Sequence, residues 1–285
     1  MSPTDPNPPI PPPAAGRPPR HRRPRPVVLR REGPLLVAHR GFSRDGLENS
    51  LAAFAAAREL GADVLETDVH ATADGVLVAF HDDRLDRTTD AEGELACTPW
   101  SVVSRARIGG REPVPRLAEV LEAFPGAVLN IDVKAPGAVG PLVALLRSTG
   151  AWERVVVASF SERRRRAVVR ALPAGTATSA GAPLVAAVVA AVRSPVPAAV
   201  RRRAVARALS GVDVLQVPVD VATDGFVRAV HDAGRLVHVW TVDDVPTMHR
   251  LLDAGVDGVM TDRTDLLRRV LDARGARRSG PAASA

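Results

Sequence analysis

The sequence has one cysteine, one lysine and no tyrosine among its 285 residues, and it has no long apolar run. Cys97 has no partner for an internal disulfide, and no Cys/His cluster has the spacing of a zinc site. The longest wholly apolar run, 184–192, is far shorter than the roughly 20 residues that span a bilayer. No apolar segment of a secretory signal follows the basic start. We therefore expect no membrane span, a cytoplasmic location and oxygen ligands for any metal.

The formal net charge of +6 is concentrated at the two ends of the chain. Residues 1–34 carry +5 and residues 268–285 carry +4, so the segment between them carries −3. The protein body is thus not basic, and we expect no specific nucleic-acid partner. Residues 1–26 contain eleven prolines and cannot bury a core. This composition predicts a disordered Pro/Arg-rich arm over 1–34, and similar reasoning predicts a disordered tail over 273–285.

Between these ends, short β-branched or apolar runs alternate with Ala-, Leu- and Arg-rich stretches of helical period, which is typical of parallel βα units. We expect strands at 35–39, 63–69, 128–133, 155–159, 176–180, 213–217, 236–240 and 258–261. We expect helices at 50–60, 117–124, 139–147, 162–171, one or two pieces within 183–209, 225–233, 245–253 and 265–272. Eight such units in about 240 residues predict an α/β fold, a (β/α)8 TIM barrel over 35–272.

One connection is longer than the others. After the second strand, Gly75 allows a turn into a short strand at 76–80, and about 35 residues rich in Asp, Arg, Thr, Gly and Pro precede the next helix. Loops of this length in compact domains are usually functional or partly folded. We therefore expect a small insertion at about 82–113.

Acidic side chains end two neighbouring strands of the predicted barrel. Glu66 and Asp68 are two residues apart and leave the same face of a strand, and Asp132 and Lys134 repeat this spacing on the next strand. Three carboxylates at the barrel mouth repel one another unless a cation neutralises them, and carboxylates select Ca²⁺ or Mg²⁺. The sequence therefore predicts a metal site, with a salt-bridge network to Lys and Arg as the alternative.

Two histidines lie close to these carboxylates. His39 ends the first strand and His81 follows the short strand at 76–80. Such a pair beside a metal-bound phosphate can divide the proton transfers, one histidine deprotonating the nucleophile and the other protonating the departing alkoxide. Arg40 and Lys134 are suitable partners for phosphate oxygens, and Trp240 at its strand end can form a wall of the alcohol pocket.

Together these motifs resemble the glycerophosphodiester phosphodiesterase family over about residues 35–271. They occur in the family's order, and they are His39-Arg40-Gly41, Glu48-Asn49-Ser50, Glu66-Thr67-Asp68-Val69, Asp74-Gly75, His81-Asp82, Leu85-Asp86-Arg87-Thr88-Thr89, Asp132-Val133-Lys134, Ser159-Phe160, Val239-Trp240-Thr241-Val242, Asp257-Gly258 and Thr261-Asp262. A lone His-Arg-Gly is weak evidence, whereas so many motifs in register are strong evidence.

The resemblance implies metal-dependent hydrolysis of glycerophosphodiesters to glycerol 3-phosphate and an alcohol. It implies Ca²⁺ or Mg²⁺ on Glu66, Asp68 and Asp132, with His39 and His81 as the acid/base pair. It also implies that Arg40 and Lys134 bind phosphate. The family usually has Glu where this chain has Asp132, and the shorter side chain can loosen the metal site.

Two alternatives remain open on the sequence, and a third class of barrel enzyme is excluded. The first is a lysophospholipase D or a cyclising phosphodiesterase with the same site chemistry. The second is a phosphate-binding barrel that has lost turnover through the change at Asp132. The third class, a metal-dependent amidohydrolase barrel, needs a His-x-His pair on the first strand, which this chain lacks.

Overall fold

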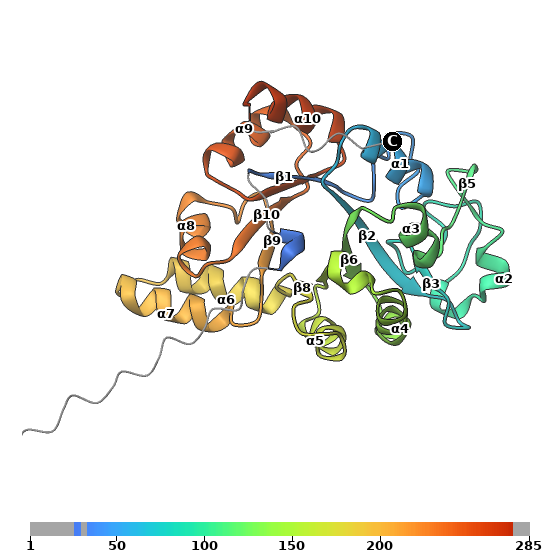
Figure 1. The fold of residues 1–285 in the computed structure, drawn as a ribbon, viewed down its shortest axis with the longest axis horizontal. Helices are drawn as coiled ribbons and strands as arrows, with labels where there is room; N and C mark the ends of the chain where they lie inside the picture. Colours follow the sequence, from blue (N-terminus) through green and yellow to red (C-terminus); the bar gives the residue numbers. More distant parts are fainter. Residues whose placement is uncertain (1–25, 30–32, 276–285) are drawn as a thin grey trace, which may run out of the picture.

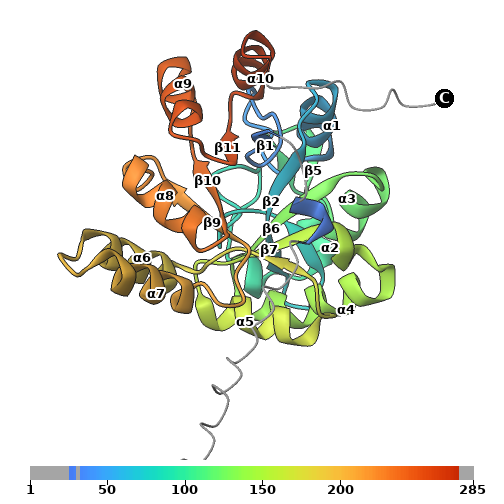
Figure 2. The same ribbon diagram turned by 60° about the vertical axis from the view of Figure 1, so that its left-hand side comes forward.

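A computed structural model describes residues 26–29 and 33–275, and its strands form a nearly closed barrel with helices around it (Figure 1 and Figure 2). The barrel strands run parallel in the sheet order β8-β7-β6-β2-β1-β11-β10-β9. They are β1 (Leu35–Ala38), β2 (Val64–Ala71), β6 (Val128–Val133), β7 (Val155–Ala158), β8 (Ala177–Thr178), β9 (Val214–Pro218), β10 (Leu236–Trp240) and β11 (Gly258–Thr261). The predicted (β/α)8 barrel is confirmed.

Helices occupy the connections between strands. They are α1 (Leu51–Glu59), α2 (Trp100–Val103), α3 (Leu117–Ala123), α4 (Val139–Thr149), α5 (Glu162–Ala171), α6 (Ala182–Arg193), α7 (Ala198–Ala208), α8 (Asp224–Asp232), α9 (Val245–Asp253) and α10 (Thr264–Ala273). Several begin at a side-chain cap: the Ser50 hydroxyl accepts a hydrogen bond from the Ala53 amide, and the Ser161 hydroxyl accepts one from Arg164. The break between α6 and α7 falls at Pro195 and Pro197, which lack the amide donor of a continuous helix.

The barrel is weakest at β8, which is two residues long where the sequence predicts a strand over 176–180. Beyond it, Ser179 forms an isolated parallel bridge with Val214 of β9. Closure at this seam uses the backbone bonds from Asp213 N to Thr178 O and from Ala180 N to Val214 O, both 3.0 Å. The residues here are Ala, Thr and Ser, which fill less of the sheet surface than the Val-rich strands elsewhere.

Alternate residues of each strand face two different cores. Those facing outward, such as Leu36, Leu65 and Ile131, pack against the surrounding helices in the largest hydrophobic cluster. Those facing inward fill the barrel, for example Leu35, Val37 and Met260. Near the C-terminal ends of the strands, the inward-facing side chains become polar. The candidate site lies at this end of the barrel.

The floor of the barrel is covered by a short 3₁₀ turn, η1 (Val27–Leu29), that precedes β1. Leu29 is 2% exposed and packs against the first residues of β7 to β10, among them Val156 and Val214. This part of the chain lies inside the arm predicted to be disordered over 1–34. The structure corrects that boundary, because the aliphatic side chain of Leu29 is buried against the barrel. Residues 1–25 and 276–285 lie outside the described part.

The predicted insertion is a folded unit beside β2 and α3 (Figure 1). It follows β3 (Leu77–Ala79), which pairs antiparallel with β2, and contains η2 (Leu95–Cys97), α2 and the hairpin of β4 (Arg107–Ile108) and β5 (Glu112–Pro113). Phe80, Leu85 and Leu95 belong to its own small core. Among the helices of the described residues, none is long and apolar enough to cross a membrane.

Candidate active site

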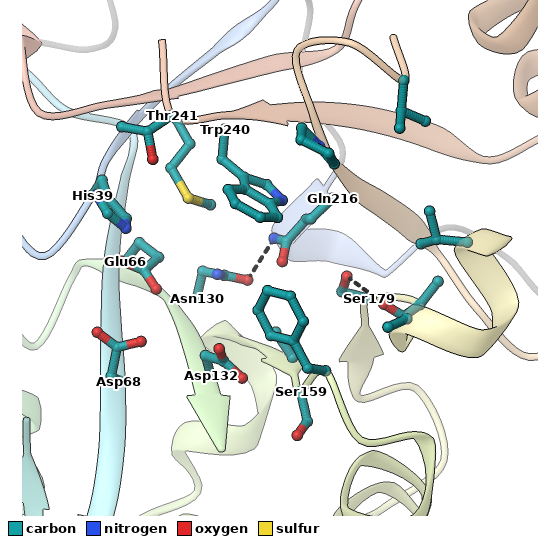
Figure 3. A pocket seen from close by; sticks show the side chains of 18 of the residues that line it. His39, Glu66, Asp68, Asn130, Asp132, Ser159, Ser179, Gln216, Trp240 and Thr241 are labelled. Carbon is teal, nitrogen blue, oxygen red and sulfur yellow. Dashed lines mark hydrogen bonds between the residues drawn. The ribbon is translucent and has the colours of Figure 1, made fainter. Parts of the chain in front are cut away.

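The C-terminal ends of the barrel strands surround a pocket of about 640 Å³. Figure 3 shows side chains from several strands converging on it. Its lining includes all eight side chains singled out from the sequence: His39, Arg40, Glu66, Asp68, His81, Asp132, Lys134 and Trp240. They meet because parallel strands end at the same rim, and the register pairs Asp68 directly with Asp132.

The carboxylates form an ion-pair network with two cations. Lys134 Nζ lies 2.9 Å from Asp68 Oδ1 and 2.7 Å from Asp132 Oδ2, and Arg40 Nε lies 3.3 Å from Asp68 Oδ2. Burial raises the pKa of Asp68, but the charges of Lys134 and Arg40 outweigh it and hold that pKa below its usual value. Burial and then the Asp68 charge raise the pKa of Glu66 to about 8. The site thus holds more acidic groups than nearby cations.

Glu66, Asp68 and Asp132 offer oxygen ligands of the kind that Ca²⁺ and Mg²⁺ prefer. Within the described part of the chain, no group of three or more His, Cys, Asp or Glu side chains is arranged to hold a metal ion. The chemistry nevertheless fits a hard cation. Asp132 Oδ1 is buried without a hydrogen-bond partner, burial raises the Asp132 pKa, and Glu66 accepts one hydrogen bond, from the Arg40 amide at 2.9 Å. The salt-bridge alternative describes the present arrangement, with Lys134 between two of the carboxylates.

Each histidine is oriented by an aspartate. His39 Nδ1 lies 2.8 Å from Asp262 Oδ1, and His81 Nδ1 lies 2.5 Å from Asp82 Oδ1. A carboxylate at Nδ1 fixes the imidazole so that Nε2 is left for a substrate. Burial lowers the pKa of His39, yet the Asp262 hydrogen bond and the charges of Glu66 and Asp262 outweigh it, so this pKa lies above its usual value.

Glu48 and Asn49, which have no assigned role in the sequence analysis, hold these groups in place. Arg40 has a left-handed backbone, φ +55°, and its guanidinium donates to Glu48 Oε1 at 2.9 Å. Asn49, also left-handed, donates to Asp68 Oδ2 at 3.2 Å and accepts from the Thr67 hydroxyl at 2.7 Å. Both belong to quoted motifs, so the motif positions carried the signal, whereas their contacts depend on the loop conformation.

Gly41, the third residue of the His-Arg-Gly motif, occupies a position that requires glycine. Its φ is +83°, and a Cβ there would lie 2.7 Å from the backbone carbon of Ala53 in α1. Only glycine allows the loop after β1 to turn this close to the helix. The loop in turn sets the directions of His39 and Arg40.

An aromatic pair stands at one side of the pocket. Trp240 and Phe160 meet edge to face, with ring centroids 5.7 Å apart, and Lys134 Nζ lies 5.6 Å from the Phe160 centroid. Deeper in the barrel, Gln216 donates to Asn130 Oδ1 at 2.8 Å (Figure 3). The base of the pocket is therefore polar, and its rim on the β7 side is aromatic.

Comparison with known proteins decides the family. Residues 39–266 match the model of the glycerophosphoryl diester phosphodiesterase family. The chain belongs to this family. It is 43% identical over 254 residues to a Mycobacterium tuberculosis protein named "Probable glycerophosphodiester phosphodiesterase 2", an alignment covering 87% of the chain and 94% of that protein. It is 31% identical over 250 residues to the glycerophosphodiester phosphodiesterase of Caldanaerobacter subterraneus, covering 82% and 96%.

A solved structure also matches the barrel of this member of the glycerophosphoryl diester phosphodiesterase family. The glycerophosphodiester phosphodiesterase of Agrobacterium tumefaciens superposes with a TM-score of 0.70 at 27% identity, covering 84% of the chain and 99% of that protein. The resemblance inferred from the motifs is thus confirmed, and the protein is a phosphodiesterase enzyme.

Proposed function

We propose that this phosphodiesterase hydrolyses glycerophosphodiesters to sn-glycerol 3-phosphate and an alcohol, with a divalent cation and with His39 and His81 as the acid/base pair. The observation that carries the proposal is the pair of His–Asp contacts beside a carboxylate-lined pocket. His39 interacts electrostatically with Glu66, and His81 does so with Asp68, so the two imidazoles lie near the acidic cluster from different elements.

The chain's own residues then divide the work of the reaction. One imidazole Nε2 takes the proton of the attacking hydroxyl, and the other gives a proton to the departing alkoxide. Arg40 and Lys134 bind phosphate oxygens, Arg40 with a planar fork and Lys134 as a point charge. Trp240 and Phe160 hold the alcohol or glycerol group beside the reacting phosphorus.

Glu66, Asp68 and Asp132 are the residues that would hold the cation, Ca²⁺ or Mg²⁺. Bound there, the ion would polarise a phosphoryl oxygen and lower the pKa of an attacking hydroxyl. Support comes from the excess of buried carboxylates over cations and from the unpartnered Asp132 Oδ1.

The acid/base assignment is tested by replacing each histidine with alanine. We expect kcat on glycerophosphocholine to fall by about 10²- to 10⁴-fold in His39→Ala and in His81→Ala, because each variant loses one proton transfer. Choline release measures turnover, and circular dichroism checks the fold. If both variants keep more than a tenth of the wild-type kcat, the assignment is wrong.

The metal assignment is tested by titration calorimetry and by melting curves. A cation that binds only the folded protein raises the melting temperature, and EDTA should abolish turnover. Asp68→Asn should weaken the metal-induced shift, because it removes a charged ligand while keeping the shape. Asp132→Glu should preserve or raise affinity, because it lengthens the ligand. Turnover that survives EDTA, with no binding below millimolar ion, would leave the carboxylates as a structural network.

A further inference from the structure

The charge of the protein body is divided between two regions of the chain. Residues 163–212 contain ten arginines and no Asp, Glu or Lys, so this segment carries +10. The rest of residues 35–267 therefore carries −13. The basic segment contains nearly all of α5 and the whole of α6 and α7, which follow one another along the chain. Positive potential is thus concentrated on these helices, although the body as a whole is acidic.

The arginines of α7 differ from several of those in α5. In α5, Arg165 and Arg166 both pair with Glu162. Within residues 26–29 and 33–275, no carboxylate pairs with the arginines of α7, which are Arg201, Arg202, Arg203 and Arg207. The last three of these side chains are exposed. Their charge is therefore not offset by the protein and can act on an anion outside it.

The connection between α6 and α7 is apolar and exposed. Figure 1 and Figure 2 show this helix pair projecting from the barrel, with the connection away from the strands. Val196 in the connection is 37% exposed, and Val200 in the first turn of α7 is 51% exposed. Arg203 and Arg207 lie three and seven residues beyond Val200, so they share one side of the helix with it. We call Val196, Val200, Arg203 and Arg207 the hairpin surface.

This combination of side chains favours a lipid bilayer over other anionic partners. A dissolved phosphate or a nucleic acid would pair with the arginines but leave the two valines in water. At a bilayer surface, arginines meet headgroup phosphates while neighbouring apolar side chains enter the boundary with the acyl chains. The two ends of this chain are basic, so like charge opposes their binding to the same surface.

We propose that the hairpin surface docks the enzyme on an anionic lipid bilayer. Beside it, a cavity of about 450 Å³ between α7 and α8 is lined by Arg201, Arg202 and Arg228 together with Asp232. An excess of arginines in a recess of this size suits the phosphate of one lipid headgroup. Since α6 also lines the active-site pocket as far as Arg193, docking holds that pocket beside the bilayer. The proposal does not depend on which diester is hydrolysed.

Binding is measured by sedimentation of the full-length protein with vesicles. We expect it to bind vesicles of phosphatidylcholine containing about one third phosphatidylglycerol, and to bind pure phosphatidylcholine at least about tenfold more weakly. Raising the salt from about 0.1 M to about 0.5 M should release most of the protein, because salt screens the attraction. Equal binding to both kinds of vesicle, or to neither, overturns the inference.

Two exposed Val and Arg pairs, each three residues apart, provide matched variants of the full chain. Val200→Asp with Arg203→Glu changes the hairpin surface, and Val102→Asp with Arg105→Glu changes the insertion, where Val102 is 41% exposed. Both double variants lower the net charge from +6 to +3. The hairpin variant should bind anionic vesicles at least about tenfold more weakly than the insertion variant. Equal binding by the two would mean that the basic ends carry the interaction, and the inference would be wrong.

Two further measurements separate docking from folding and from binding of other polyanions. Both double variants should keep wild-type kcat on glycerophosphocholine, because neither pair lines the active-site pocket. Arg203→Gln with Arg207→Gln removes charge without adding any, and it should also weaken vesicle binding at least about tenfold. If the hairpin variants lose binding to polyuridylate but keep binding to vesicles, the surface is a nucleic-acid site and the bilayer assignment is wrong.

Discussion

His238 lies in the interior of the barrel, where a charge is costly. It belongs to β10, is 3% exposed, and pairs in register with Gly258 of β11. A Cβ at Gly258 would lie 2.8 Å from its Cδ2, so the imidazole occupies the space that glycine leaves. Its Nε2 is buried without a hydrogen-bond partner. Burial outweighs the charge of Asp257 and lowers the His238 pKa to about 4, which keeps this ring neutral in the fold.

This lowered pKa links folding stability to pH. Between the ordinary value of 6.5 and about 4, the unfolded chain binds a proton at His238 that the folded chain does not. Stability therefore falls as pH is lowered through this range, by up to about 3 kcal/mol from this residue. The free energy of unfolding, measured with urea at several pH values, should depend less steeply on pH for His238→Leu than for the wild type. Parallel pH profiles for the two proteins would contradict the assignment, whatever their absolute stabilities.

The positions of the site residues were predictable from the sequence, but their contacts were not. The alternation of side chains along a strand placed Glu66 and Asp68 on one face, and the end of a parallel strand placed them beside Asp132. Sequence spacing says nothing about where a flexible side chain points. The contacts of Lys134 with Asp68 and Asp132 therefore emerged only from the structure.

At the scale of elements, the insertion supports the active site through Arg87. Arg87 donates to Asp82 and to Glu48, so it joins the insertion to the loop after β1. The hydrogen bond from Arg87 is the main cause that lowers the pKa of Asp82 to about 2. The lowered pKa keeps this carboxylate charged beside His81. The insertion thus positions His81 as well as covering one side of the barrel.

Replacing Arg87 with alanine tests this positioning role. We expect kcat to fall by about 10- to 100-fold, because Asp82 and Glu48 lose their shared partner. The melting temperature should change little, since exposed ion pairs contribute little to stability. Arg84→Ala, which removes the exposed pair with Asp86 in the same insertion, is the control and should keep wild-type kcat. Equal kcat in the two variants would show that Arg87 does not act through His81.

The comparison between prediction and structure is clearest in two elements. The first strand was predicted within one residue, because a short Val- and Leu-rich run before a polar end has few alternatives. The fifth was predicted over 176–180 and is only Ala177–Thr178, because its pairing depends on neighbours far away in sequence. The hairpin and short helix inside the insertion were not predicted, since turn-rich sequence has no regular period.

At the scale of the whole molecule, η1 covers the floor of the barrel, whereas residues 1–25 precede it in the chain. Leu29→Ala should cost about 2–5 kcal/mol of unfolding free energy, because it leaves a cavity among Val156, Val214 and Leu236. Deletion of residues 1–25 retains Leu29 and should leave the melting temperature and glycerophosphocholine turnover nearly unchanged. Thermal melts and choline release measure both variants. A large loss on deletion would mean that the arm packs on the barrel or affects its mouth.

The pairing of β1 with β11 has a consequence for how the protein is made. Among the strands of the described residues, β1 leaves the ribosome first, yet one of its two neighbours in the sheet, β11, which starts at Gly258, emerges last. Its hydrogen-bonding edge toward β11 therefore stays unpaired while the intervening chain is translated. Contacts between distant segments also form slowly, because a long loop must close first. Premature termination before β11 would thus release a chain with two open sheet edges, a product prone to aggregation and dependent on chaperones.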